Sequence, residues 1–193
     1  MATVNSYTEI MPTPDRTSLD QIVSAACDLL ETEGLAGLTM QAVAQRVGVR
    51  PPSLYKRVQN RDQLIRLVAE ATLTEFASRL GPSPSFVEIA TNFRKFGHER
   101  PVAFQLVLIP GAGIPLAESQ YGAAAVEPIL RVARELAGEE QSLEAARTLT
   151  AWAVGFITME LNGSFRLGGN VDDAWEYGLT TIVAAISAGT GTK

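Results

Sequence analysis

The first third of the chain carries apolar residues at helical spacing. Ser18, with Gln21 three residues later, has the pattern of a capping box at a helix start, and Gly34 favours a helix end. Between these signals, a helix of 3.6 residues per turn would have one apolar face. That face consists of Leu19, Ile22, Val23, Ala26, Leu29 and Leu30. The pattern therefore predicts a first helix from Ser18 to about Gly34.

Two short helices joined by a glycine turn are predicted next. Thr39 can cap the first of them, and Gly48 ends it. Two prolines beginning at Pro51 can open the second, because proline is tolerated in a first turn, where its missing amide would have no intrahelical partner. Leu54 and Val58, four residues apart, form the inner face of this third helix. This spacing is typical of a helix-turn-helix.

The remaining pattern is also helical. Asn60 and Gln63 predict a cap for a long helix from Arg61 to about Leu80, where Gly81 begins a break. Further helices are expected at about 85–99, 101–108, 117–137, 142–166 and 172–187. The apolar run at 102–109 would fit a buried strand by composition, but its flanks fit a short helix equally well. The prediction is an all-α fold of about nine helices, with an N-terminal three-helix helix-turn-helix domain followed by a larger helical domain.

Charge is distributed unevenly along the chain. The 193 residues carry a formal net charge of −5, from 16 basic and 21 acidic residues. Between Gln41 and Arg66, however, six basic residues face only one acid, Asp62, which gives +5 there and leaves −10 for the remainder. A phosphate-binding surface needs only local positive potential. The distribution indicates a DNA-binding region inside an otherwise acidic protein.

The third predicted helix has a polar side. In a helix-turn-helix, the second of the two helices enters the major groove of DNA while the first crosses the backbone. At about 100° per residue, the side away from the inner face carries Pro52, Ser53, Tyr55 and Lys56. With flanking residues that can bind phosphates or base edges, the predicted DNA contacts are Thr39, Gln41, Arg50, Pro52, Ser53, Tyr55, Lys56, Arg57 and Arg61. The alternative is a tight helical corner whose basic residues are simply solvated.

The run from Glu33 to Leu64 resembles the DNA-binding domain of the tetracycline-repressor-like (TetR) family. Thr39, the Ala-x-x-x-Gly-Val turn at 44–49, the Leu-Tyr pair at 54–55 and Arg61 occupy positions that recur in that family. The resemblance covers about residues 17–80. It implies DNA contacts at Thr39, Gln41, Pro51, Pro52, Ser53, Tyr55, Lys56, Arg57 and Arg61. The Lys-Arg pair at 56–57 departs from the aromatic or histidine pair of many relatives.

The resemblance also implies a domain division and a regulatory mechanism. The sequence itself predicts a disordered lead at 1–16 and a domain boundary after Leu80. By the resemblance, 17–80 would be the DNA-binding domain with its connecting fourth helix, and 81–193 a domain that binds a small-molecule effector and forms a homodimer through its last two helices. The fourth helix would link the two domains. Residues 151–167 resemble a subgroup with a Trp-x-x-His-Gly-Phe pattern, in which Trp152, Gly155 and Phe156 match and Val154 replaces the histidine.

Candidate residues for ligand binding and dimerisation come from the second half of the chain. An effector pocket, apolar as most pockets are, would be lined by some of Phe93, Phe96, Phe104, Leu108, Tyr121, Trp152 and Phe156. A dimer interface would use Met159, Ala174, Trp175, Gly178, Thr181, Ile182 and Ala185, many of them small enough for close helix approach. Both sets would also fit an ordinary monomer core.

Several classes of function are not supported by the sequence. No signal peptide or apolar run of membrane-spanning length is found, so we expect a cytoplasmic protein. Cys27 and His98 are too few for a metal site and fit a core hydrophobe and a surface residue, so no cofactor is expected. The sequence contains no phosphate-binding loop and no nucleophile-base pair that would indicate an enzyme. The sequence predicts a ligand-responsive repressor of an operator in double-stranded DNA, the alternative being a DNA-binding regulator governed by a protein partner or by abundance.

Overall fold

The computed structural model describes residues 17–82 and 85–189, and every regular element in these ranges is a helix. The nine helices are α1 (Leu19–Gly37), α2 (Met40–Arg46), α3 (Pro51–Leu54), α4 (Arg61–Leu80), α5 (Phe86–Glu99), α6 (Pro101–Leu108), α7 (Ser119–Ala137), α8 (Ser142–Leu161) and α9 (Val171–Gly189). The predicted all-α fold is confirmed, and the run at 102–109 is mostly the helix α6. The predicted disorder of 1–16 lies outside the described residues. No helix in the described ranges has the length and hydrophobicity needed to cross a membrane.

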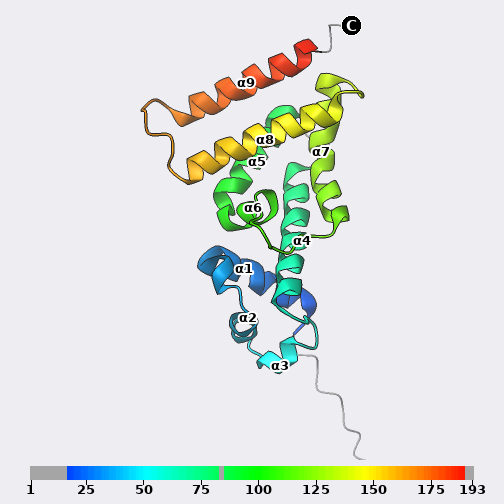
Figure 1. Cartoon of the computed structure of the whole chain (residues 1–193), viewed down its shortest axis with the longest axis vertical. Helices are drawn as coiled ribbons and strands as arrows, with labels where there is room; N and C mark the ends of the chain where they lie inside the picture. The colour runs from blue at the N-terminus through cyan, green and yellow to red at the C-terminus, as the bar shows by residue number, and fades with distance from the viewer. Residues whose placement is uncertain (1–16, 83–84, 190–193) are drawn as a thin grey trace, which may run out of the picture.

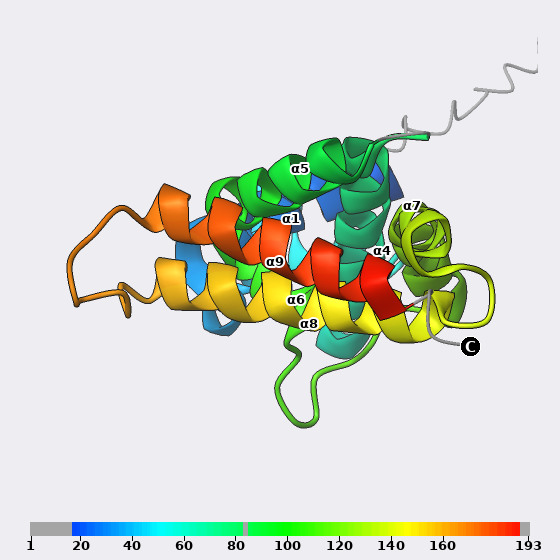
Figure 2. The ribbon, with the colours of Figure 1, turned by 90° about the horizontal axis from the view of Figure 1, so that it is seen from above.

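The helices form an elongated molecule with two ends of different character. In Figure 1, α1, α2 and α3 form a small N-terminal unit at one end, and α4 runs from it into a larger C-terminal body made of α5 to α9. Helices α8 and α9 lie side by side at the far end, as the view from above in Figure 2 shows. The short α3 therefore lies about as far as possible from the last two helices.

Local capping signals place the starts of the helices. The Ser18 hydroxyl accepts from the Gln21 amide, and the Gln21 side chain accepts from the Ser18 amide, so the predicted capping box is present. Thr39 caps α2 by accepting from the Ala42 amide at 3.1 Å. The Asn60 side chain caps α4 from the Gln63 amide at 2.8 Å. All three predicted caps are confirmed.

Two predicted helix ends were wrong. Helix α8 ends at Leu161 instead of near residue 166, because the amide of Gly163 bonds to Glu160 O and that of Ser164 to Met159 O, with Gly163 at φ 61°. This Schellman arrangement ends a helix. Helix α3 ends at Leu54 and continues to Val58 only as a turn, in which Leu54 O accepts from the amides of both Arg57 and Val58.

Two hydrophobic cores lie one above the other along the molecule. The N-terminal core gathers buried side chains from α1, α2 and α3, and the C-terminal core gathers those of α5, α7 and α8. Helix α4 enters both, with Leu64 and Val68 in the first and Leu73 and Phe76 in the second. Helix α6 is also shared. The two cores are therefore joined by helices common to both.

The close approach of α5 to α6 and α8 depends on Gly97. A Cβ atom at this buried position would lie 2.5 Å from the Ile157 side chain and 3.3 Å from the Phe104 ring. We expect Gly97→Ala to lower the free energy of unfolding by about 1–3 kcal/mol, the usual cost of overpacking a core. Gly122→Ala in α7 is the matched control, since its Cβ would meet no atom within 4 Å. Urea denaturation that found the two variants equally stable would contradict this packing.

Candidate nucleic-acid interface

A glycine in the left-handed conformation forms the turn between α2 and α3. Gly48 has φ 72°, and its amide bonds to Gln45 O at 3.2 Å. The next amide, of Val49, bonds to Ala44 O at 2.9 Å. These bonds end α2 and point the chain into the proline-initiated α3. The turn sets the angle between the two helices.

Helix α3 and its following turn have one buried side and one exposed side. Leu54 and Val58 are both 0% exposed within the N-terminal core. Ser53, Tyr55 and Lys56 are exposed, with Tyr55 at 52%. This matches the orientation projected from the sequence. Burial of the two apolar residues holds the polar side outward.

The other predicted contacts surround this exposed side. Arg50, Pro51, Pro52 and Arg57 are exposed, and Gln41 is exposed in the first turn of α2. We call the exposed residues Arg50, Ser53, Tyr55, Lys56 and Arg57 the basic face. Two further exposed cations of the same region, Arg46 in α2 and Arg66 in α4, were not among the predicted contacts.

Arg61 is oriented differently from the basic face. Its Nε donates to Leu38 O at 2.8 Å, and its Nη2 donates to Leu35 O at 2.5 Å. The guanidinium therefore ties the start of α4 to the last turn of α1 and to the residue that follows it. A side chain predicted to contact DNA, both from its charge and from the resemblance, is engaged with the protein's own backbone. Sequence spacing could not show this, because the acceptors are 23 and 26 residues away.

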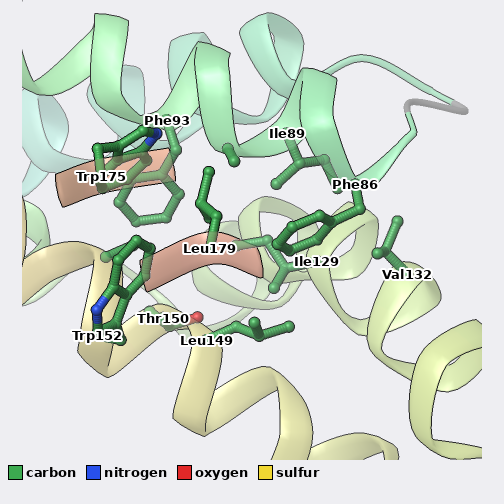
Figure 3. Close-up of a pocket in the computed structure, with 12 residues that line it drawn as sticks. Phe86, Ile89, Phe93, Ile129, Val132, Leu149, Thr150, Trp152, Trp175 and Leu179 are labelled. Carbon is green, nitrogen blue, oxygen red and sulfur yellow. The ribbon is translucent and has the colours of Figure 1, made fainter. Parts of the chain in front are cut away.

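An apolar cavity lies in the C-terminal body, between α5, α7, α8 and α9. Its free volume is about 30 Å³, which is room for little more than a water molecule while the lining side chains stay in place. Its lining comprises Phe86, Ile89, Ala90, Phe93, Ile129, Val132, Leu149, Thr150, Trp152, Ala153, Trp175 and Leu179 (Figure 3). Apart from the Thr150 hydroxyl and two indole N–H groups, these side chains are hydrocarbon, and none carries a charge.

Two of the seven predicted pocket residues, Phe93 and Trp152, line this cavity. The rings of Phe96 and Phe104 are 0% exposed in the C-terminal core and are not part of the lining. The remaining three, Leu108, Tyr121 and Phe156, are partly buried against that core. The missed lining residues of α5 have a signal in the sequence, since 86, 89, 90 and 93 follow helical spacing on one face.

An ionic cluster fastens one edge of the cavity. Arg94 of α5 lies 2.5 Å from Glu160 of α8 and 2.7 Å from Asp172 of α9, and its guanidinium lies 5.2 Å from the Trp175 ring centre. Nε2 of the exposed His98 lies 3.2 Å from Glu160. Burial opposes ionisation of Glu160, but the hydrogen bonds from Arg94 and His98 lower its pKa below the usual value. The carboxylate stays charged and joins three helices.

The predicted dimer residues divide between two sides of α8 and α9. Met159, Ala174, Thr181 and Ala185 are exposed, and Met159 is 45% exposed. The half-buried positions are Gly178 and Ile182. Trp175 is 5% exposed and points into the cavity, where its ring stacks on Trp152 at 4.7 Å. These two helices therefore combine an exposed outer face with an inner face that lines the cavity.

The subgroup pattern predicted for α8 does not have the expected spacing. Along α8 only Ala153 separates Trp152 from Val154, so the tryptophan does not keep the spacing of the Trp-x-x-His-Gly-Phe pattern. The proposed subgroup resemblance is thus limited to the Gly-Phe pair at 155–156.

Cys27 is half-buried against the N-terminal core, and burial raises the pKa of its thiol to about 11. Such a thiol is protonated at neutral pH and a poor nucleophile.

Family models match both parts of the chain. The model of bacterial regulatory proteins of the tetR family matches residues 22–68, which include α2, α3 and the exposed basic face. The model of the tetracyclin repressor-like C-terminal domain matches residues 86–182, which include every residue lining the apolar cavity. Together the matches include most residues of both hydrophobic cores.

Individual tetracycline repressors are similar to this chain. The class E repressor of Escherichia coli is 34% identical over 94 residues, covering 49% of this chain and 42% of that protein. The class C repressor of Escherichia coli is 25% identical over 195 residues, covering 86% of this chain and 89% of that protein. The structure of a TetR variant from Acinetobacter baumannii in complex with minocycline has a TM-score of 0.66 at 23% identity, covering 91% of this chain and 99% of that one.

The engagement of Arg61 with two backbone carbonyls can be tested by stability. We expect Arg61→Met to lower the free energy of unfolding by about 1–3 kcal/mol, because the carbonyls of Leu35 and Leu38 both lose their charged donor. Arg66→Met on the exposed side of α4 is the control, with an expected change within about 0.5 kcal/mol. Equal stability of the two variants in chemical denaturation would show that the tie is unimportant.

Proposed function

The chain belongs to the tetR family of bacterial regulatory proteins. We propose that it is a repressor that binds an operator in DNA as a homodimer. It releases the operator when a small, uncharged, apolar molecule occupies the cavity. The observation that carries the proposal is the basic face. Five exposed polar or cationic residues lie in α3, at its N-cap and in the turn that follows it, while Leu54 and Val58 of the same segment are completely buried. A rigidly held helix of this kind is the element that enters a major groove.

The basic face supplies two kinds of contact. Lys56, Arg57 and Arg50 can pair with phosphates or reach guanine edges, and Ser53 and Tyr55 can donate hydrogen bonds. The acidic remainder of the chain would limit non-specific binding to DNA.

Homodimerisation would place two basic faces on one duplex. Half-sites of a symmetric operator are about 34–36 Å apart or a multiple of this distance, so two copies of the basic face are needed. The outer sides of α8 and α9 carry exposed apolar or small residues, including Met159, Ala174 and Ala185. They lie at the end of the molecule opposite α3 (Figure 1). A twofold interface there would leave both basic faces uncovered.

The chemistry of the cavity favours an uncharged effector. Its lining offers aromatic rings and a single hydroxyl, so a charged molecule would lose its hydration without gaining an ionic partner. A protein of the same fold, the TetR variant from Acinetobacter baumannii, is in complex with minocycline, which supports a small-molecule effector for this chain. The aromatic walls of this chain, with Trp152 stacked on Trp175, favour a flat apolar molecule.

Paired substitutions in the basic face test DNA binding. We expect Tyr55→Ala combined with Lys56→Ala to weaken binding to a duplex selected from a random pool by at least about tenfold, because each side chain contributes about 1 kcal/mol or more through contacts to DNA. Fluorescence anisotropy at several salt concentrations would also show a shallower salt dependence, since a phosphate contact is lost in each protomer.

The control for this pair is Lys95→Ala, which removes an exposed lysine of α5 in the C-terminal body. It should bind the duplex as tightly as the unmodified protein. Circular dichroism would establish that the paired variant remains helical. Unchanged duplex affinity in a folded Tyr55→Ala, Lys56→Ala protein would show that the basic face does not contact DNA.

A matched pair of ligands tests the character of the effector. The two tryptophans of the chain both line the cavity, so saturable quenching of their fluorescence reports its occupancy. We expect the dissociation constant of neutral 4-nitrotoluene, measured from this quenching, to be at least about tenfold lower than that of its anionic analogue 4-nitrobenzoate. The reason is that the carboxylate would lose its hydration in the apolar lining. Bound 4-nitrotoluene should also weaken operator binding by about 5- to 150-fold, the usual range of allosteric coupling.

Ala90→Leu adds bulk to the cavity lining and should weaken binding of 4-nitrotoluene while leaving duplex binding intact. Equal affinity for the neutral and the anionic ligand would exclude the proposed ligand class. Tight binding of 4-nitrotoluene without an effect on the operator would leave the protein a DNA-binding repressor, but one that does not respond to this class of molecule.

A further inference from the structure

Helix α6 belongs to both hydrophobic cores. Ala103 and Leu106 are buried in the N-terminal core, together with residues of α1 to α4. Phe104, the next residue after Ala103, is 0% exposed in the C-terminal core, where its ring lies 6.1 Å from that of Phe93. Phe93 in turn lines the apolar cavity. Adjacent sides of this one short helix thus contact the N-terminal unit and, through Phe93, a wall of the cavity.

A carboxylate from the N-terminal unit caps α6. Glu31 of α1 accepts from the amide of Val102 at 3.2 Å and from the amide of Ala103 at 3.0 Å. Arg100, the N-cap residue of α6, provides no side-chain cap itself. The first amides of a helix lack intrahelical acceptors and carry its positive dipole end, so an anion bound there is well placed. In this protein the anion comes from about 70 residues earlier in the chain.

Arg100 extends this contact to a third helix. Its Nε lies 3.3 Å from Glu31 Oε1, and its Nη1 lies 3.2 Å from Glu75 Oε2 on α4. The three side chains are each between 18% and 29% exposed, so the charges are partly shielded from water. Partly buried ionic hydrogen bonds are stronger and more directional than those on an open surface. Glu31, Arg100 and Glu75 therefore join α1, α6 and α4 at one point.

We propose that Glu31 is a positioning residue that sets the N-terminal unit relative to α6 and makes each respond to the state of the other. The proposal rests on the proposed function, because the state of the N-terminal unit is defined by operator binding. Displacement of Phe104 moves α6, and the two amides held by Glu31 carry α1 with them. Since coupling between two sites is reciprocal, operator binding must also alter α6.

The first test measures the contact without any ligand. Glu31→Gln keeps the size of the side chain but removes its charge and one of its two oxygen acceptors. We expect amide hydrogen exchange at Val102 and Ala103, followed by NMR, to become about tenfold faster or more. Asp28→Asn, an exposed acid one turn earlier in α1, is the matched control and should leave both rates unchanged. Unchanged rates in Glu31→Gln would overturn the proposal.

The second test separates positioning from simple stabilisation. In the unmodified protein and in Asp28→Asn, saturating operator duplex should change the amide exchange rates of Val102 and Ala103 by about threefold or more. A threefold change corresponds to a modest allosteric coupling. In Glu31→Gln the duplex should still bind, but those rates should no longer respond to it. A full response in Glu31→Gln, or no response in the unmodified protein, would overturn the positioning role. Failure of the unmodified protein to bind any selected duplex would instead refute the proposed function, while the exchange rates without DNA would still decide whether Glu31 holds α6.

Discussion

One continuous helix, α4, is packed into both hydrophobic cores, and the arrangement of everything else follows from it. Its first half places Leu64 and Val68 among the residues of the N-terminal unit, and its second half places Leu73 and Phe76 in the C-terminal body. Twenty helical residues span about 30 Å as a stiff rod. The N-terminal unit therefore cannot rotate independently of the C-terminal body. Helix α6 makes a second connection between the cores, with Glu31 holding its N-terminus.

The N-terminal unit is made of helices too short to be stable alone. Helix α2 has seven residues and α3 has four, whereas isolated helices below about 12–15 residues are marginal in water. Their stability comes from burial of Leu54 and Val58, from the Gly48 turn and from the bonds that Arg61 makes to α1–α2 carbonyls. The same packing leaves the basic face exposed, so stability and DNA recognition use opposite sides of one element.

Helix α9 combines two roles in the same way. Its inner side brings Trp175 and Leu179 to the apolar cavity, while its outer side exposes Ala174 and Ala185 at the end of the molecule. The cluster around Arg94 anchors the start of this helix to α5 and α8. A ligand that displaces the cavity wall would consequently act on the proposed dimer face and, through Phe93 and Phe104, on α6.

The sequence by itself determined the all-α fold, the helix-turn-helix and the sides of α3 that are buried and exposed, because caps, glycine turns and apolar periodicity act between residues three or four positions apart. Tertiary structure alone decided that Arg61 binds backbone carbonyls, that Trp175 points into the cavity and that Glu31 caps α6. These contacts join residues that are far apart in the chain. The residue types determine which kinds of contact these side chains can make. Their partners depend on how the helices pack, and local sequence patterns do not specify that packing.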